Sequence, residues 1–186
     1  MSCIFNDTLL GGVKLIIPKV YYDSRGYFLE AMNVETLASL GIGETIVQEN
    51  QAYSIKGVLR GLHLQRPPFA QGKLIRAIQG KILDVAVDVR IGSPTFGQHY
   101  KTVLSDENQH QLWIPPGFAH GALTLSETSI MAYHCTAPYS KEHSVSIRYN
   151  DPDLAIDWGL ESFILTELDR NAPLLKKIDS GFTYSN

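Results

Sequence analysis

Residues 57–76, GVLRGLHLQRPPFAQGKLIR, place one histidine between two basic side chains. His63 lies shortly after Arg60 and before Lys73. An imidazole titrates near about 6.5 in water, so such a histidine can accept a proton from a substrate at neutral pH. Two other interpretations remain open at this point, a metal ligand and a buried histidine held by hydrogen bonds.

A second histidine, His120, lies in the segment PPGFAH, which has the P-x-G-x-x-H pattern of the second motif of cupin barrels. Metal-binding cupins combine that histidine with an H-x-H motif and a glutamate, because a divalent ion needs several convergent donors. The corresponding residues here are His63, Leu64 and Gln65, so an amide replaces the second histidine. Lys73 adds a positive charge that would repel a cation. We therefore expect no metal site.

Composition excludes several classes of partner. The chain has 186 residues, a formal net charge of -3 and no run of lysines and arginines, so nucleic acid is not an expected partner. No apolar run reaches the roughly 20 residues that span a bilayer, and the start lacks the pattern of a secretory leader, so no membrane contact is expected. The cysteines, Cys3 and Cys135, predict free thiols in a reducing cytoplasm.

Short strands separated by turn residues must position these side chains. Between about residue 45 and residue 150 no long stretch has helical periodicity, which predicts an all-β core. The clearest strand is residues 81–90, KILDVAVDVR. Its alternation predicts an apolar face of Leu83, Val85, Val87 and Val89, and a mixed face of Ile82, Asp84, Ala86 and Asp88.

Residues 73–79, KLIRAIQ, are predicted to pair with this strand in a hairpin, because Gly80 supplies the positive φ of a tight turn. A short helix is expected at residues 33–41, with Asn33 as its N-cap and Gly41 at its end. Further strands are expected at residues 99–105, 110–116, 121–126, 129–136 and 144–150.

The pattern as a whole predicts a mainly β fold, a sandwich or barrel, in a single domain of residues 1–186. The resemblance of the P-x-G-x-x-H segment to the second cupin motif implies a cupin jelly roll, a double-stranded β-helix barrel, with a few short peripheral helices. We expect its core at about residues 45–150, with N-terminal strands and C-terminal helical turns around it. The turns are placed in residues 151–173, on the outside of the barrel.

Several motifs in order along the chain resemble one family. They are DSRGYFLE, QENQAYSIKGVLRGLHLQ, PPFAQGKLIR, DVAVDVR, SPTFG, IPPGFAHG, YHCTAPY and NDPDLAIDW. Together they are similar to the dTDP-4-dehydrorhamnose 3,5-epimerase family, enzymes of dTDP-sugar synthesis built on a metal-free cupin jelly roll. The resemblance runs from roughly residue 7 to residue 173.

The resemblance implies a reaction and a role in it for four side chains. Hydrogens on carbon beside a ketone are acidic because the carbanion is delocalised as an enolate, so epimerisation next to C4 needs a base, a cation and an acid. His63 matches the general base, and Asp169 matches the carboxylate that pairs with it. Lys73 matches the cation that stabilises the enolate oxygen, and Tyr133 matches the acid on the opposite face.

The resemblance also implies a set of substrate-binding residues, because diphosphate and thymine call for arginine and aromatic side chains. The positions that match residues holding the sugar or diphosphate are Arg60, Gln48, Asn50, His120 and Arg170. Tyr139 matches the aromatic residue that stacks on the base. Dimers of the family lend the equivalents of Arg25, Phe28 and Glu30 to the neighbouring subunit, so a homodimer with exchanged residues is expected.

Some positions depart from the family's pattern or lack an obvious partner. Leu168 stands where lysine is usual, just before Asp169, and Leu64 and Ala122 stand where aromatic residues are frequent and could reshape the pocket. Asp84 and Asp88, on the mixed face of their strand, would be costly to bury without partners. Lys73 is a candidate partner for Asp88 if the turn at Gly80 and Lys81 sets the register.

The resulting hypothesis is a cytoplasmic, cofactor-independent epimerase of a dTDP-4-keto-6-deoxyhexose. The expected reaction inverts C3 and C5 of dTDP-4-dehydro-6-deoxy-D-glucose to give dTDP-4-dehydro-L-rhamnose, for rhamnose-type dTDP-sugar and polysaccharide biosynthesis. Three alternatives remain: a C3-only epimerase or ketoisomerase for another dTDP-deoxysugar, a cupin that binds a nucleotide sugar without transforming it, and a metal-dependent cupin. Solvent isotope entering the ligand and metal analysis of the protein would separate them.

Overall fold

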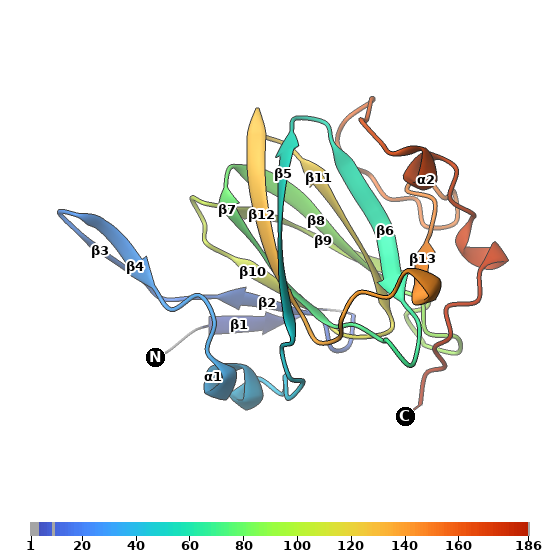
Figure 1. Cartoon of the computed structure of the whole chain (residues 1–186), viewed down its shortest axis with the longest axis horizontal. Helices are drawn as coiled ribbons and strands as arrows, with labels where there is room; N and C mark the ends of the chain where they lie inside the picture. Colours follow the sequence, from blue (N-terminus) through green and yellow to red (C-terminus); the bar gives the residue numbers. More distant parts are fainter. Residues whose placement is uncertain (1–3, 9, 186) are drawn as a thin grey trace.

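The computed structural model describes residues 4–8 and 10–185 and consists mainly of antiparallel β-strands (Figure 1). One sheet has six strands and a second has five, and a separate two-stranded hairpin stands apart from both. The helices of the described residues are short, and none is long and apolar enough to cross a membrane. The mainly β prediction is therefore confirmed. Cys3 lies outside the described residues.

The elements follow in sheet order. The six-stranded sheet contains β1 (Ile4–Asp7), β2 (Lys14–Ile17), β10 (Gln111–Ile114), β7 (Lys73–Gln79), β12 (Thr128–Cys135) and β5 (Gln48–Ile55). The five-stranded sheet contains β13 (Ser144–Ser146), β6 (Leu59–Gln65), β11 (Phe118–Thr124), β8 (Lys81–Asp88) and β9 (His99–Ser105). The hairpin is β3 (Val20–Asp23) with β4 (Gly26–Leu29), and the helices are α1 (Val34–Ser39), η1 (Lys141–His143), α2 (Glu167–Arg170) and η2 (Leu175–Lys177).

The predicted hairpin between residues 73–79 and 81–88 is wrong. β7 pairs with β10 and β12, whereas β8 pairs with β9 and β11 in the other sheet. Gly80 does have the expected positive φ of 75°. Its turn carries the chain from one sheet to the other, because a tight turn fixes a change of direction but not the neighbour of the next strand.

The alternation along β8 is confirmed, and both of its faces are buried. Ile82 and Ala86 belong to a core cluster with residues of β7, β10 and β12, so this face lies between the two sheets. Val85, Val87 and Val89 belong to a second cluster with Leu154, Trp158 and Leu175 of the C-terminal segment. The C-terminal segment therefore covers the outer side of the five-stranded sheet, as Figure 1 shows beside β6.

The short helix predicted at residues 33–41 is confirmed as α1. The Asn33 side chain accepts a hydrogen bond from the Thr36 N–H at 3.0 Å, which satisfies one of the free donors of the first turn. Gly41 follows the helix with a φ of 77° and donates to the Ala38 carbonyl.

The strand predictions hold with changes at their ends. Residues 99–105 form β9 as predicted, whereas the strand predicted at residues 144–150 stops after Ser146. Ile147 still exchanges backbone hydrogen bonds with Leu62 of β6. The Arg148 N–H then donates to the Pro173 carbonyl, so from this residue on the backbone bonds to the C-terminal segment instead. The helical turns expected in residues 151–173 are represented by α2, which lies beside β6.

Asp88 is paired, but not with Lys73 as predicted. Its carboxylate accepts hydrogen bonds from Arg90 at 2.7 and 2.9 Å, and from the Ser93 and Thr95 hydroxyls at 2.6 Å each. All of these partners come from the turn directly after β8. Local residues therefore neutralise this buried carboxylate, and Lys73 remains available for another role.

Candidate active site

A histidine and an aspartate meet at the edge of the inter-sheet space. His63 on β6 and Asp169 on α2 approach to 2.5 Å between Nε2 and Oδ1. The Asp169 side chain is almost fully buried, whereas the His63 side chain is 36% exposed. The imidazole therefore presents its free side to a cleft while its other nitrogen contacts a carboxylate, which is the geometry of a positioned base.

Thr166 fixes the position of Asp169 in two ways. It is the N-cap of α2 and accepts from the Asp169 N–H at 3.1 Å, while its hydroxyl donates to Asp169 Oδ2 at 2.9 Å. Burial raises the pKa of Asp169, but hydrogen bonds from His63, Thr166 and the Gly61 backbone together lower it below the usual value. The carboxylate is therefore ionised at neutral pH and can stabilise an imidazolium on His63.

A bulge in β6 brings Arg60 and His63 to the same side of the sheet. His63 pairs with His120 of β11, and Arg60 pairs with Ala122, so three steps on β6 match two on β11. Gly61 makes this possible, since its φ is 121° and a Cβ there would lie 2.6 Å from the His120 carbonyl. Without the extra residue, strand alternation would direct Arg60 and His63 to opposite faces.

Lys73 and Tyr133 reach the same cleft from the opposite sheet. Lys73 is on β7 and pairs in register with Cys135 of β12, two residues beyond Tyr133. Burial lowers the pKa of Lys73, while nearby Cys135 and Asp84 act in the opposite direction. Burial raises the pKa of the Tyr133 phenol, which keeps its proton at neutral pH. The site thus brings together an imidazole from one sheet and an amine and a phenol from the other.

His120 belongs to a second histidine–aspartate pair. Its Nε2 lies 2.9 Å from Asp84 Oδ2, and both side chains are buried. His120 lies next to His63 across the strand pair and lines the same cleft as Lys73. The PPGFAH histidine is thus held by a buried carboxylate in the wall of the cleft.

The cleft has two lobes, named here by one residue of each. The Gln48 lobe has a volume of about 450 Å³, and its wall includes Gln48, Asn50, Gln65, Gln71, Tyr139, Ser144 and Ser146. The Arg60 lobe has a volume of about 320 Å³, and its wall includes Arg60, His120, Met131, Thr166 and Asp169. The residues common to both are His63, Lys73, Tyr133 and Leu168. The proposed chemical groups therefore lie where the two lobes meet.

The predicted binding residues of the cleft are held by direct contacts. Gln48 donates to Asn50 Oδ1 at 2.9 Å and accepts from the Tyr139 N–H at 3.1 Å. The Tyr139 ring is 65% exposed, so its face is free to stack on a ligand. Arg60 is anchored by bonds from Nε to the Ser54 hydroxyl and from Nη2 to the Tyr53 carbonyl.

Four predicted binding residues do not line this cleft. Arg170 points to solvent, 3.9 Å from Glu167. Arg25 pairs with its neighbour Asp23 in the turn of the β3–β4 hairpin, and Phe28 is 63% exposed there. The hairpin projects away from the two sheets as an arm (Figure 1).

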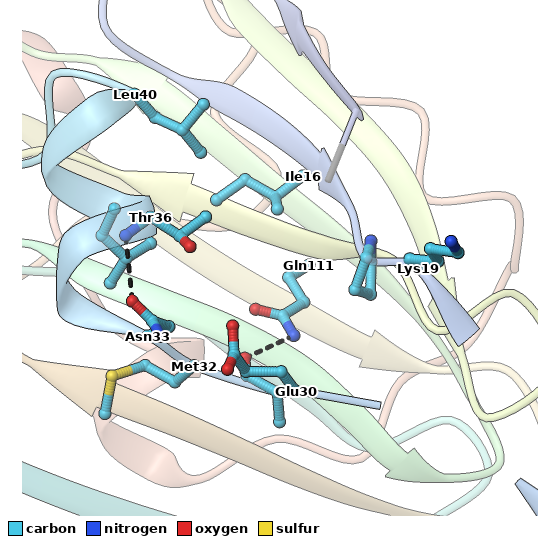
Figure 2. A pocket seen from close by; sticks show the side chains of 11 residues that line it. Ile16, Lys19, Glu30, Met32, Asn33, Thr36, Leu40 and Gln111 are labelled. Atoms are coloured by element: carbon cyan, nitrogen blue, oxygen red, sulfur yellow. Dashed lines mark hydrogen bonds between the residues drawn. The ribbon is translucent and has the colours of Figure 1, made fainter. Parts of the chain in front are cut away.

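Glu30, at the base of this arm, lines a different hollow (Figure 2). This hollow has a volume of about 40 Å³ and lies against α1, where Gln111 donates to the Ala31 carbonyl at 2.8 Å. The hollow is too small for a nucleotide sugar. Within one chain, therefore, the arm residues have no access to the cleft around His63.

The three departures from the family's pattern occupy different surroundings. Leu168 is 69% exposed and lies on the rim, where it borders both lobes and a shallower hollow of about 860 Å³ beyond Tyr139. Leu64 is buried beside the Gln48 lobe. Ala122 is buried in the core between the sheets.

Sequence reasoning missed residues that support the site. Gln65 donates to the Phe69 and Pro138 carbonyls and accepts from the Ser140 N–H. It therefore links the loop at Phe69 to the segment on both sides of Tyr139. The amide at the H-x-Q position therefore has a structural use. Over residues 4–8 and 10–185, no group of three or more His, Cys, Asp or Glu side chains could hold a metal ion. The T-x-x-D spacing of Thr166 and Asp169 could have predicted that Thr166 is the N-cap of α2.

Fold and site together define a jelly-roll protein equipped for proton transfer to and from a bound substrate. The family model for dTDP-4-dehydrorhamnose 3,5-epimerase matches residues 7–177. The chain therefore belongs to the dTDP-4-dehydrorhamnose 3,5-epimerase family, and the predicted cupin jelly roll is confirmed.

Relatives in distant organisms are similar over nearly the whole chain. The dTDP-4-dehydrorhamnose 3,5-epimerase of Methanothermobacter thermautotrophicus is 48% identical and covers 90% of this chain and 91% of its own. That of Sinorhizobium fredii is 42% identical and covers 97% and 93%. The structure of dTDP-6-deoxy-D-glucose-3,5-epimerase from Legionella pneumophila, in complex with dTDP-4-keto-L-rhamnose, is 46% identical, covers 100% of both chains and gives a TM-score of 0.96.

Proposed function

We propose that this protein inverts C3 and C5 of dTDP-4-dehydro-6-deoxy-D-glucose to give dTDP-4-dehydro-L-rhamnose. The observation that carries the proposal is the His63–Asp169 pair, which faces Lys73 and Tyr133 where the two lobes of the cleft meet. Membership of the epimerase family supports the same reaction. The chain would act as one domain in the cytoplasm, and the buried free thiol of Cys135 suits a reducing compartment.

The proposed mechanism needs no oxidation or reduction. His63 removes the proton from C3 or C5, and Asp169 stabilises the imidazolium that results. Lys73 stabilises the negative charge that develops on the C4 oxygen. Tyr133 then delivers a proton to the other face of the same carbon. Because His63 belongs to the five-stranded sheet and Tyr133 to the six-stranded sheet, the two groups approach the cleft from different sides, as inversion requires.

The two lobes divide the substrate in this proposal. The Arg60 lobe, with His63, His120 and Met131, would take the sugar and part of the diphosphate. The Gln48 lobe would take the nucleoside, with Tyr139 stacked on the base. Arg170, which is exposed at the rim, would contact the substrate only from outside this cleft.

We further propose that the protein is a homodimer in which each chain completes its partner's site. The arm exposes Tyr22, Tyr27 and Phe28, and the outer side of the six-stranded sheet exposes Tyr53 and Ile55 on β5. Exposed apolar groups of this kind usually mark a contact surface. A second copy would cover them and receive Arg25, Phe28 and Glu30 at its own cleft.

Mixing two inactive variants should restore activity if sites are shared. An Arg25→Ala chain keeps its own base but lends a defective arm, whereas a His63→Ala chain lends an intact arm but lacks a base. After subunit exchange, about half of the mixed dimers' sites would contain both intact groups, as expected for two sites per dimer. Activity is measured before and after mixing, with the oligomeric state followed by light scattering. An active protein that stays monomeric would refute the proposal.

The function is tested by incubating dTDP-4-dehydro-6-deoxy-D-glucose with the protein in deuterium oxide. We expect deuterium at both C3 and C5 and the appearance of the L-rhamno isomer, because each inversion passes through exchange with solvent. NMR of the sugar measures both results together. The protein is treated with a chelator first, since none of the proposed groups needs a metal.

Other outcomes of this experiment would identify the alternatives. Deuterium and inversion at C3 alone would mark a C3-only epimerase, and a different keto sugar would mark a ketoisomerase. Binding without any exchange would mark a nucleotide-sugar-binding protein. Activity that returns only when one particular metal is added would overturn the metal-independent mechanism.

A further inference from the structure

Asp84 is a buried carboxylate that the proposed reaction does not yet use. It lies on β8 between the two sheets, with no exposed surface. One oxygen, Oδ2, lies 2.9 Å from His120 Nε2. The other, Oδ1, is buried without any hydrogen-bond partner among the residues that the structure describes.

The contrast with Asp88 shows that this arrangement is unusual. Asp88 is on the same face of the same strand and equally buried, but Arg90, Ser93 and Thr95 satisfy its carboxylate. Burying an ionised carboxylate with an unpaired oxygen costs stability, and such groups in native proteins call for an explanation. The unpaired oxygen of Asp84 therefore calls for an explanation from its surroundings.

Those surroundings contain the cation of the active site. Burial lowers the pKa of Lys73, and the charges of Cys135 and Asp84 act against this effect. The direct partner of Asp84, His120, lines the Arg60 lobe together with Lys73 and His63. The carboxylate therefore stands behind two groups that face the substrate. The titratable groups on the elements around it are Lys73 on β7, Tyr100 on β9, His120 on β11, His63 and Arg60 on β6, and Tyr133 and Cys135 on β12.

We propose that Asp84 is a positioning residue, which fixes the ring of His120 and supplies the counter-charge that keeps Lys73 an ammonium ion beside the substrate's C4 oxygen. The inference rests on the proposed epimerase function, because only a developing enolate needs that cation. A neutral lysine could not balance the enolate charge. In this proposal the Asp84 carboxylate is kept for its negative charge beside Lys73 and not for packing in the core.

The test is Asp84→Asn, which keeps the shape of the side chain and removes its charge. We expect kcat to fall about 10-fold or more at pH 8, while KM and the affinity for dTDP change little, because the charge acts on the transition state. Without the carboxylate, the pKa of Lys73 falls, so Lys73 loses its proton at a lower pH. The alkaline limb of the kcat profile should therefore move down by about one pH unit or more. A structural defect alone would not move that limb.

The matched control is Asp88→Asn, on the same strand and equally buried. It should lower the unfolding temperature without moving the alkaline limb, because Asp88 is paired within its own turn. Asp84→Glu, which keeps the charge, should retain the wild-type limb. If Asp84→Asn shows an unshifted profile while the wild-type protein exchanges deuterium, the role of Asp84 is refuted. Absence of exchange in the wild type would contradict the proposed function instead.

A measurement on the unaltered protein decides the case if the Asp84 variants do not fold. Carbon-13 NMR of labelled lysine, assigned with Lys73→Arg, follows the protonation of Lys73 directly. The proposal requires Lys73 to carry its proton at pH 7 in the folded protein. A lysine signal that is already deprotonated at pH 7 would overturn it.

Discussion

Replacing His63 with alanine should reduce deuterium incorporation at both C3 and C5 by about 10³-fold or more. A positioned base contributes roughly 10²–10⁴-fold, and the loss here removes the only step that starts either inversion. The carboxylate that contacts His63 belongs to Asp169, and Thr166 holds it in place through a hydrogen bond to its other oxygen. NMR of the sugar in deuterium oxide measures the loss.

The fold and the binding of nucleotide should survive this change, since the His63 side chain is 36% exposed and contributes little to the core. Circular dichroism and dTDP titration check both points. His99→Ala is a suitable control, because His99 lies on β9 and does not line either lobe. Near-normal exchange in the His63 variant would require a different base.

Replacing Tyr133 with phenylalanine should separate exchange from inversion. The substitution keeps the ring and removes the hydroxyl, so His63 and Lys73 can still form the enolate. A carbanion at C5 would then be reprotonated mainly from the histidine side, which restores the original configuration with deuterium in place. We expect inversion at C5 to fall by about 10²-fold or more, while exchange falls much less.

The effect at C3 should be smaller if water reaches that carbon. Chiral analysis of the recovered sugar, together with its deuterium content, gives the two rates for each carbon. An equal loss of exchange and inversion at both carbons would make Tyr133 a binding or enolate-stabilising group. No change in either rate would leave Tyr133 as a packing residue and require another acid.

Local signals in the sequence were sufficient for single elements. The alternation of residues 81–88 and the Asn33 cap depend on neighbours within a few positions, so β8 and α1 were predicted correctly. Pairing between strands depends on distant residues. Gly80 signalled a turn, but nothing nearby showed that β7 and β8 enter different sheets.

The site was predictable only in part for the same reason. Arg60 and His63 are three residues apart, and alternation alone would separate them. The bulge at Gly61 that joins them depends on the close approach of β11. The pairing of His63 with Asp169 came from the resemblance, because no local rule connects residues 106 positions apart. The pairing of Asp84 with His120 also required the folded neighbours, because 36 positions separate the two residues.

The alternation of the strands between two sheets also bears on how the chain folds. The six-stranded sheet contains strands from β1 to β12, and the five-stranded sheet contains strands from β6 to β13. Strands of the two sheets therefore follow one another in mixed order along the chain. Neither sheet can be completed while the chain is still being synthesised through this region, and long-range pairing of this kind is slow. The contact between His63 and Asp169 closes a loop of 106 positions. The proposed active site would therefore form late in folding. A nascent chain on the ribosome can contain His63 and still be unable to remove a proton from the substrate.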